Sequence, residues 1–252
     1  MRSYRELAEV QRLVAAGLND CQIARQTAIP RSTVREWRSK KRWLTAPAEG
    51  CTSCGAVAHD FERLPTSYVY LLGLYLGDGC LSAHRRGVYR LRVVLDSRYP
   101  GIVAECAAAM QAVLPSNRPG LQPNHDGTAW EVWIYSKQLA CLFPQHGAGR
   151  KHDRLIQLAD WQRRAIERHP QLLLRGLIHS DGCRFMNTIR HAQKTYAYPR
   201  YNFSNRSADI RRIFCEACDL VGVDWRVMNA CNISVARRAS VARLDEFIGP
   251  KR

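Results

Sequence analysis

The chain has 252 residues, of which 46% are hydrophobic, and it carries a formal net charge of +16. This size and composition are typical of a globular protein with one large domain or two to three small ones. No apolar run approaches the length of a membrane span and no signal peptide is recognised, so we expect neither a membrane-spanning nor an exported protein. The excess of 38 Lys and Arg over 22 Asp and Glu predicts a polyanionic partner, with nucleic acid as the first candidate. Ten cysteines without an export signal favour reduced thiols, and we expect a cytoplasmic, nucleoid-associated protein.

Residues 4–43 contain three short runs in which apolar residues recur at helical spacing. Asn19 and Gln22 stand at capping-box spacing before the second run. The arrangement resembles the helix-turn-helix of resolvases and transposases, in which the second helix of the pair enters the major groove of DNA. The resemblance implies a small all-α DNA-binding domain over residues 1–45, with a helical protein-contact module as the alternative. Its candidate DNA contacts are Arg31, Ser32, Arg35, Arg38, Lys40 and Lys41.

Residues 46–64 are expected to form a linker that contains a zinc knuckle. Cys51 and Cys54 belong to a Cys-x-x-Cys-Gly sequence, which lets both thiolates point at one ion, and His59 follows as a third candidate ligand. A fourth ligand is needed, and the candidate sources are Cys141, His146 and His152. We expect a structural Zn²⁺ at this place, and a turn without metal is the alternative.

Two similar stretches, Leu71–Cys80 and Leu174–Cys183, organise the rest of the chain. Each is an apolar run with small residues four apart, and each ends in Asp-Gly-Cys. Small residues at this spacing line one helix face, so we expect the two helices to pack closely and to bring Asp78 and Asp181 together. The glycine after each aspartate suits a left-handed helix cap. Two carboxylates at two helix C-termini concentrate negative charge, which hard divalent cations such as Mg²⁺ neutralise.

The segments that follow these stretches repeat one order of elements, and the two aspartates are 103 residues apart. Tyr89–Asp96 alternates apolar residues with Arg90 and Arg92, as a strand with one buried face does. We therefore predict an α+β fold in which an αββαββα unit with an antiparallel, saddle-shaped sheet is duplicated with pseudo-two-fold symmetry, over residues 65–160 and 161–252. The predicted elements are helices at 67–79, 101–114, 171–182, 209–220 and 241–248, strands at 89–96, 130–135, 185–189, 200–204, 224–228 and 232–236, and a linker at 143–160.

The two stretches resemble the motif of the LAGLIDADG family of homing endonucleases, over Leu72–Gly79 and Leu174–Gly182. The family's last acid, which binds metal at the scissile phosphates, is present in both copies, as Asp78 and Asp181. The resemblance implies a monomeric pseudo-dimer that straddles double-stranded DNA and cuts both strands with Mg²⁺ or Mn²⁺. The family's first acid is absent from both copies, and the residues at those positions are Leu76 and His179.

Further candidate site residues follow from the repeat. The backbone carbonyls of Gly77 and Ser180 would complete the metal shell. Lys137 and Arg238 are, by repeat position, candidates for the basic residues that the family keeps near its reaction centre. The sheet residues expected to contact DNA are Arg90, Arg92, Arg200 and Asn202, with a solvated outer sheet face as the alternative.

These features together predict a site-specific, metal-dependent DNA endonuclease of the homing type. One alternative is a sequence-specific transcriptional regulator that keeps the nuclease fold without its chemistry. Another is an intron maturase that uses the same saddle on RNA, which the helix-turn-helix disfavours because A-form RNA hides its major groove. The plainest alternative is a pair of ordinary core helices that end in Asp-Gly.

Overall fold

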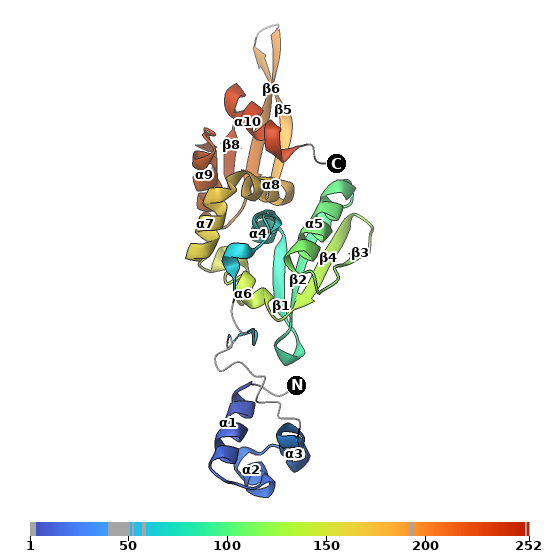
Figure 1. The fold of residues 1–252 in the computed structure, drawn as a ribbon. Helices are drawn as coiled ribbons and strands as arrows, with labels where there is room; N and C mark the ends of the chain where they lie inside the picture. Colours follow the sequence, from blue (N-terminus) through green and yellow to red (C-terminus); the bar gives the residue numbers. More distant parts are fainter. Residues whose placement is uncertain are drawn as a thin grey trace. The chain divides into compact units, whose positions relative to one another are not determined.

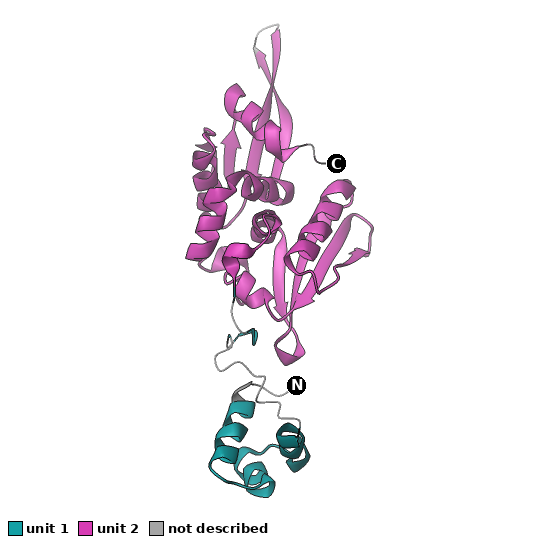
Figure 2. Cartoon of the chain, in the orientation of Figure 1, with its two compact units in different colours: residues 1–59 teal, residues 60–252 magenta. Residues whose placement is uncertain are grey.

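The computed structural model describes residues 4–39, 51, 53–56, 59–191, 194–249 and 251 (Figure 1). The chain divides into two compact units, residues 1–59 and residues 60–252 (Figure 2). Two of the predicted DNA contacts, Lys40 and Lys41, lie outside the described residues, as do residues 46–50 of the predicted linker.

The N-terminal unit contains three helices, α1 (Tyr4–Ala15), α2 (Asp20–Thr27) and α3 (Arg31–Ser39). The predicted capping box is confirmed, because the Asn19 side chain accepts hydrogen bonds from two backbone amides and the Gln22 side chain accepts one from the Asn19 amide. Ala28 adopts a left-handed conformation with φ of 54° and ends α2, which leaves a three-residue turn before α3. The three helices share a small apolar core formed by Leu7, Val10, Leu13, Ile23, Ile29, Val34 and Trp37.

The C-terminal unit consists of two repeats with the same order of elements, so the predicted α+β class and the αββαββα duplication are confirmed. The first repeat contains α4 (Ser67–Gly77), β1 (Gly79–Ala83), β2 (Tyr89–Asp96), α5 (Pro100–Val113), β3 (Gly120–Pro123), β4 (Ala129–Ser136) and α6 (Leu139–Leu142). The second repeat contains α8 (Pro170–Asp181), β5 (Gly182–His191), β6 (Lys194–Ser204), α9 (Ala208–Leu220), β7 (Arg226–Val227), β8 (Asn232–Val235) and α10 (Arg238–Ile248). Helix α7 (Asp160–Arg168) joins the repeats, and short 3₁₀ helices occupy Phe61–Arg63, Arg85–Gly87 and Lys151–Asp153.

Each repeat forms one antiparallel four-stranded sheet, with strand orders β1-β2-β4-β3 and β5-β6-β8-β7. The alternation predicted for β2 is confirmed, because Leu91, Val93 and Leu95 are buried against the helices. The strands predicted at 185–189 and 200–204 are too short, since β5 spans Gly182–His191 and β6 spans Lys194–Ser204, and the strand predicted at 224–228 is too long, since β7 spans Arg226–Val227. Strand β1 was absent from the prediction, because most of its side chains are exposed or half-buried and leave no apolar alternation.

Helices α4 and α8 pack against each other in the middle of the C-terminal unit, and glycines set how closely they approach (Figure 1). A side chain on Gly73 would start 2.6 Å from the carbonyl oxygen of Leu173 and 2.9 Å from the Cα atom of Gly176. A side chain on Gly77 would collide with the side chain of Ser180. The small residues predicted to face the partner helix therefore do so, and any larger residue at these positions would force the backbones apart.

The predicted left-handed caps after the two aspartates are wrong. Asp78 itself ends α4, in a right-handed helical conformation, and Gly79 and Gly182 each begin a strand without positive φ. The glycines are required for space instead, because a Cβ atom on Gly79 would lie 2.4 Å from the Cα atom of Tyr75, and one on Gly182 would lie 2.7 Å from that of Ile178. The chain thus turns from helix to strand within one residue, which fixes each aspartate at the junction.

No helix in the described part of the chain is both long and apolar enough to cross a lipid bilayer.

Candidate active site

Asp78 and Asp181 occupy equivalent positions at the ends of the two packed helices. Asp78 caps α4, and Asp181 is the last residue of α8. The carboxylate of Asp181 lies close to the first helix as well, since a Cβ atom on Gly77 would be 3.2 Å from its Oδ2 atom. The close packing at Gly73 and Gly176 therefore delivers both carboxylates to one place, as the repeated motif predicts.

Burial and the charge of Asp181 both raise the free-energy cost of ionising Asp78. Asp78 is accessible to solvent, but the protein atoms around it desolvate its carboxylate and, with the charge of Asp181, raise its pKa to about 6. Burial also raises the pKa of Asp181 above its usual range, although a hydrogen bond from Asn205 opposes that rise. Asn205 donates from Nδ2 to Asp181 Oδ2 at 2.5 Å. The pair is thus an acidic centre whose negative charge the protein balances only in part.

Lys151 is the cation nearest to this centre in the first repeat. Its Nζ atom donates to the carbonyl oxygens of Tyr75, at 2.6 Å, and Leu76, at 2.9 Å, and also to that of Gly77. The ammonium group therefore satisfies the last carbonyls of α4, where the helix dipole is negative. Burial lowers the pKa of Lys151 to about 8, and the charges of Asp181 and Asp78 oppose that fall.

Lys251 lies at the end of the second helix, where it contacts the residue after the helix and not the helix's own last carbonyls. Its Nζ atom donates to the carbonyl oxygen of Gly182, the residue that follows Asp181. Burial lowers its pKa, while neighbouring acidic groups, Asp78 and Asp181 among them, act in the opposite direction. Sequence reasoning missed both lysines. The signal that could have found them is a repeated Gly-x-Lys, at Gly149-Arg-Lys151 and Gly249-Pro-Lys251, in which both glycines have positive φ.

A cavity of about 480 Å³ opens beside this centre. Asp181, Asn205 and the backbone of Gly77 and Gly79 form one part of its wall. The other part is basic and is lined by Arg150, Lys151, His152, Arg154 and Arg206. The Asp181 carboxylate at one side and guanidinium groups at the other suit a phosphodiester bridged to the acid by a cation.

The other predicted residues near the reaction centre lie in different surroundings. The Gly77 carbonyl accepts from Lys151, and the Ser180 hydroxyl donates back to Gly176 and Leu177 within its own helix. Lys137 follows β4 and Arg238 begins α10, where its guanidinium lies 5.7 Å from the ring centre of Tyr198. Neither of these two basic residues lines the cavity beside Asp181.

The predicted DNA-contact residues of the sheets lie on the faces turned away from the helices, because their neighbours in each strand are buried. In the first sheet, Arg90 and Arg92 both form ion pairs with Glu131, at 3.2 Å and 2.9 Å. In the second sheet, Arg200 is half-buried, and Asn202 donates to Asn232 at 3.1 Å. The predicted contacts of the first sheet thus form a mixed-charge cluster, and those of the second are one arginine and one asparagine.

The candidate DNA contacts of the N-terminal unit lie on the solvent side of α3, opposite the buried residues Val34 and Trp37. Arg31, Ser32 and Arg35 are exposed and line one surface hollow together with Glu36. Arg38 forms an ion pair with Asp20 of α2 at 2.8 Å. The helix that was predicted to read bases therefore carries its basic residues on one accessible face.

The three candidate zinc ligands within residues 51–59 come together. One ligand atom from each of Cys51, Cys54 and His59 lies within 4.8 Å of the others, and Cys54 Sγ is 3.3 Å from His59 Nε2. Gly55, directly after the second cysteine, has φ of 75°, which the tight turn of a Cys-x-x-Cys-Gly loop requires. Thiolate and imidazole at such separations form a donor set that fits Zn²⁺.

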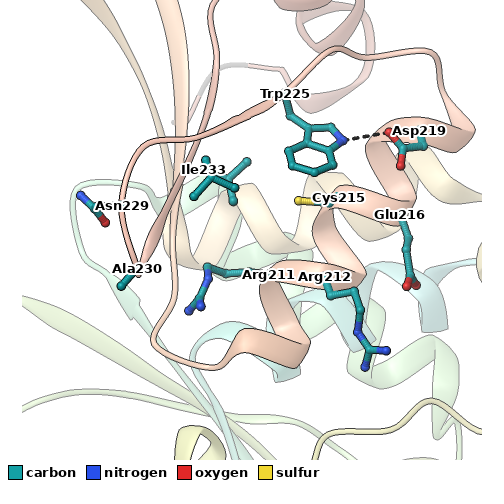
Figure 3. A pocket seen from close by; sticks show the side chains of 10 residues that line it. Arg211, Arg212, Cys215, Glu216, Asp219, Trp225, Asn229, Ala230 and Ile233 are labelled. Atoms are coloured by element: carbon teal, nitrogen blue, oxygen red, sulfur yellow. Dashed lines mark hydrogen bonds between the residues drawn. The ribbon is translucent and has the colours of Figure 1, made fainter.

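A second cavity, of about 410 Å³, lies between α9 and the β7–β8 hairpin (Figure 3). Trp225 and Ile233 form its apolar side, and the indole of Trp225 donates to Asp219 at 2.8 Å. Burial raises the pKa of the Cys215 thiol to about 11, so this thiol is protonated at neutral pH and is not a nucleophile. Arg211, on the same wall, donates to the carbonyl oxygen of Asn205 and so supports the residue that holds Asp181.

His179, at the position of the lost first acid, is a packed core residue. Its Nδ1 atom lies 2.9 Å from the hydroxyl of Tyr70, and its Nε2 atom lies 3.1 Å from the carbonyl oxygen of Ile248. Burial lowers its pKa to about 4, so the ring is neutral at physiological pH. Arg175 donates to the same carbonyl and forms a two-pronged ion pair with Glu105, at 2.8 and 2.9 Å. These contacts hold the end of α10 just before Lys251.

No protein-family model matches the chain, and no curated protein matches it. Solved structures of LAGLIDADG homing endonucleases do. The complex of I-DmoI with DNA and Mn is 16% identical, over 73% of this chain and 97% of that chain, with a TM-score of 0.48. The I-SmaMI LAGLIDADG homing endonuclease bound to cleaved DNA is 8% identical, over 74% and 84% of the two chains, with a TM-score of 0.48. These endonucleases belong to the family that the two motifs resemble. Full-length DUF199/WhiA from Thermatoga maritima is also similar, at 11% identity over 77% and 60% of the chains and a TM-score of 0.46.

Proposed function

We propose that the protein is a site-specific endonuclease that cleaves both strands of duplex DNA with a divalent metal ion. The observation that carries this proposal is the convergence of Asp78 and Asp181 at the ends of two packed helices, beside a cavity with a basic wall. A purely structural role leaves this convergence unexplained, because two desolvated carboxylates repel each other and destabilise the fold.

The donor set fits Mg²⁺ or Mn²⁺, because carboxylate and carbonyl oxygens are the ligands that hard cations prefer. The raised pKa of Asp78 points the same way, since burial and then the charge of Asp181 disfavour its ionised form, which a bound cation would stabilise. Asp78 and Asp181 would hold the metal, with the carbonyls of Gly77 and Ser180 as further ligands. When bound, such an ion acts as a Lewis acid that activates water and neutralises charge on the phosphate.

The chain's own cations would orient and stabilise the phosphodiester. Arg150, Arg154 and Arg206 face the cavity and would bind its non-bridging oxygens. Lys151, whose pKa is about 8, can hold or release a proton at Nζ near neutral pH, so it can donate to the departing oxygen. Lys251 would take this role for the second strand, since it occupies the equivalent place in the second repeat.

DNA recognition would use both units. The two sheets would each cover one half-site, with Arg90, Arg92, Arg200 and Asn202 towards the duplex. The three helices of the N-terminal unit would act as a helix-turn-helix, with α3 in the major groove. Replacing Arg31 and Arg35 by alanine should then weaken binding to a long target without changing the cleavage rate at saturating protein. An unchanged affinity would remove α3 from the interface.

We also propose that Cys51, Cys54 and His59 hold a structural Zn²⁺ together with a fourth ligand. The support is the approach of their ligand atoms and the positive φ of Gly55. Purified protein should contain about one zinc per chain, and Cys51→Ser with Cys54→Ser should lose it, whereas Cys231→Ser should retain it. A protein prepared without chelators that contains no zinc would exclude this site.

One observation favours a second candidate, a sequence-specific regulator that binds DNA without cutting it. The ammonium group of Lys151 already places a positive charge beside both aspartates, and such a charge can replace a metal as their counter-ion. The two candidates differ in the fate of bound DNA.

The deciding experiment is incubation of the full chain with a randomised duplex library, in Mg²⁺ and in EDTA, followed by sequencing of cut ends and of retained duplexes. The endonuclease predicts Mg²⁺-dependent ends that share one long site. Retention of one long site without cuts in either condition would establish the regulator.

A further inference from the structure

The β5–β6 hairpin extends beyond its sheet as a two-stranded ribbon (Figure 1). Strands β5 and β6 pair along their whole length, from Gly182 opposite Phe203 to His191 opposite Lys194. Strand β8 pairs with β6 only over Tyr201–Ser204. In the described part of the ribbon, the residues of β5 after Arg184 and those of β6 before Arg200 therefore have no third strand beside them. A two-stranded ribbon is one of the shapes that fits the major groove of B-DNA.

The two faces of the ribbon differ. Arg184 and Tyr201 are cross-strand partners, and both bind Asp245 of α10, at 2.8 and 2.6 Å, so their face is turned to the helices. Side chains alternate along a strand, so the residues next to them point away from the helices. That opposite face is formed by the cross-strand pairs Phe185 with Arg200, Asn187 with Tyr198, and Ile189 with Tyr196.

This helix-free face exposes apolar side chains at regular intervals. Phe185 is 40% exposed, Ile189 47% and Tyr196 42%. The rings of Tyr196 and Tyr198 lie nearly parallel, with centres 6.3 Å apart, and Arg238 covers the ring of Tyr198. Regularly spaced apolar groups on an otherwise unsupported ribbon cost stability in water, and a partner surface that covers them would remove that cost.

The charge around these residues identifies the partner as DNA. Residues 182–204 contain four Lys and Arg and no Asp or Glu. Arg184 is paired with Asp245 on the face turned to the helices, whereas Lys194 and Arg200 belong by register to the opposite face. The matching place in the first sheet is different, because Glu131 neutralises Arg90 and Arg92 there. A basic ribbon with apolar side chains matches a duplex whose groove presents apolar groups between phosphates, and in B-DNA those groups are the C5-methyl groups of thymine.

We propose that the ribbon reads thymine methyl groups in the major groove of one half-site, through Phe185, Ile189 and Tyr196. The proposal rests on the DNA-binding part of the proposed function but not on cleavage. Recognition by the ribbon makes the two half-sites chemically different. One half-site is read by apolar contact with thymine, and the other by the Arg90–Arg92–Glu131 cluster.

The test uses the full chain with Asp78→Asn and Asp181→Asn, so that bound DNA stays intact in Mg²⁺. Sites are selected from a randomised duplex library, and deoxyuridine then replaces thymine in one half-site at a time. We expect thymines to be enriched at one end of the selected site. Removing their methyl groups there should weaken binding by about fourfold per contacted methyl, and the other half-site should respond much less.

Two variants on the same strand assign the effect. Phe185→Ser should bind the thymine and deoxyuridine sites with nearly equal affinity. Met186→Ser is the matched control, since Met186 is 53% exposed but lies on the opposite face, and it should keep the discrimination of the parent chain.

Three results would overturn the proposal while leaving the endonuclease intact. They are a selected site without thymine enrichment at either end, equal affinity for thymine and deoxyuridine sites, and loss of self-association rather than of DNA affinity in Phe185→Ser. Failure to retain any duplex would contradict the proposed function itself.

Discussion

Lys151 donates from Nζ to the carbonyl oxygen of Tyr75 at 2.6 Å, across 76 residues of sequence. The contact places a buried cation on the last turn of the helix that ends at Asp78. Lys251 is placed beside Asp181 by a similar contact, with the carbonyl oxygen of the next residue, Gly182. The candidate active site is therefore built of two acid–lysine pairs, one from each repeat, and each lysine approaches its helix end from a segment that follows the sheet of its own repeat.

Replacing these lysines should separate cleavage from binding. Lys151→Met and Lys251→Met keep the length of the side chain and remove its charge, so each should slow cleavage by about 100-fold or more while affinity for the duplex falls only slightly. The measurement is a single-turnover cleavage rate alongside a binding titration. Lys137→Met is the matched comparison, because Lys137 does not line the cavity. A large loss of cleavage rate in Lys137→Met, with normal rates in Lys151→Met and Lys251→Met, would instead assign the catalytic role to Lys137, the residue that repeat position predicts.

The glycine contact between the two helices should be intolerant of even one methyl group. Gly73→Ala and Gly176→Ala push a Cβ atom against backbone of the partner helix, which cannot move aside as a side chain would. Each should reduce the free energy of unfolding by about 2 kcal/mol or more, measured by denaturant titration. Gly147→Ala is the control, since its Cβ atom would have ordinary contacts, 3.4 Å from the Arg154 side chain. Wild-type stability in Gly73→Ala would mean that the helices are further apart than described.

Much of this architecture was predictable, because its determinants are local in the sequence. Small residues four apart and the repeated Asp-Gly placed two packed helices and their aspartates correctly, and period-two alternation located β2. The lysines were not predictable from local pattern, because Lys151 lies 73 residues after Asp78 and its role depends on how the chain returns to α4. The residues at 143–160, interpreted as a linker, contain that lysine within a short 3₁₀ helix. Only a comparison of the two Gly-x-Lys sequences could have revealed it.

His179 should make stability sensitive to acid. Its pKa is about 4 in the folded chain, below the value of about 6.5 in the unfolded chain, so the unfolded state binds more protons between these pH values. The free energy of unfolding should therefore fall as the pH is lowered from 6.5 to 4, with a contribution from His179 of roughly 3 kcal/mol. In His179→Gln this part of the decline should be absent, whatever the variant's stability at pH 7. Parallel pH profiles for the two proteins would show that the imidazole is not buried in its neutral form.

In the proposed function, Asp78 and Asp181 serve cleavage and not DNA binding. The most direct test measures the cleavage rate and the affinity of single aspartate variants on the same selected site. Asp78→Asn and Asp181→Asn should each abolish Mg²⁺-dependent cleavage, because each removes a metal-binding carboxylate. Each should bind the site about as well as the wild type, because removing one carboxylate also relieves its repulsion of the other. Asp126→Asn, at an exposed turn, should behave as the wild type in both assays. Full cleavage by either Asp78→Asn or Asp181→Asn would contradict this account.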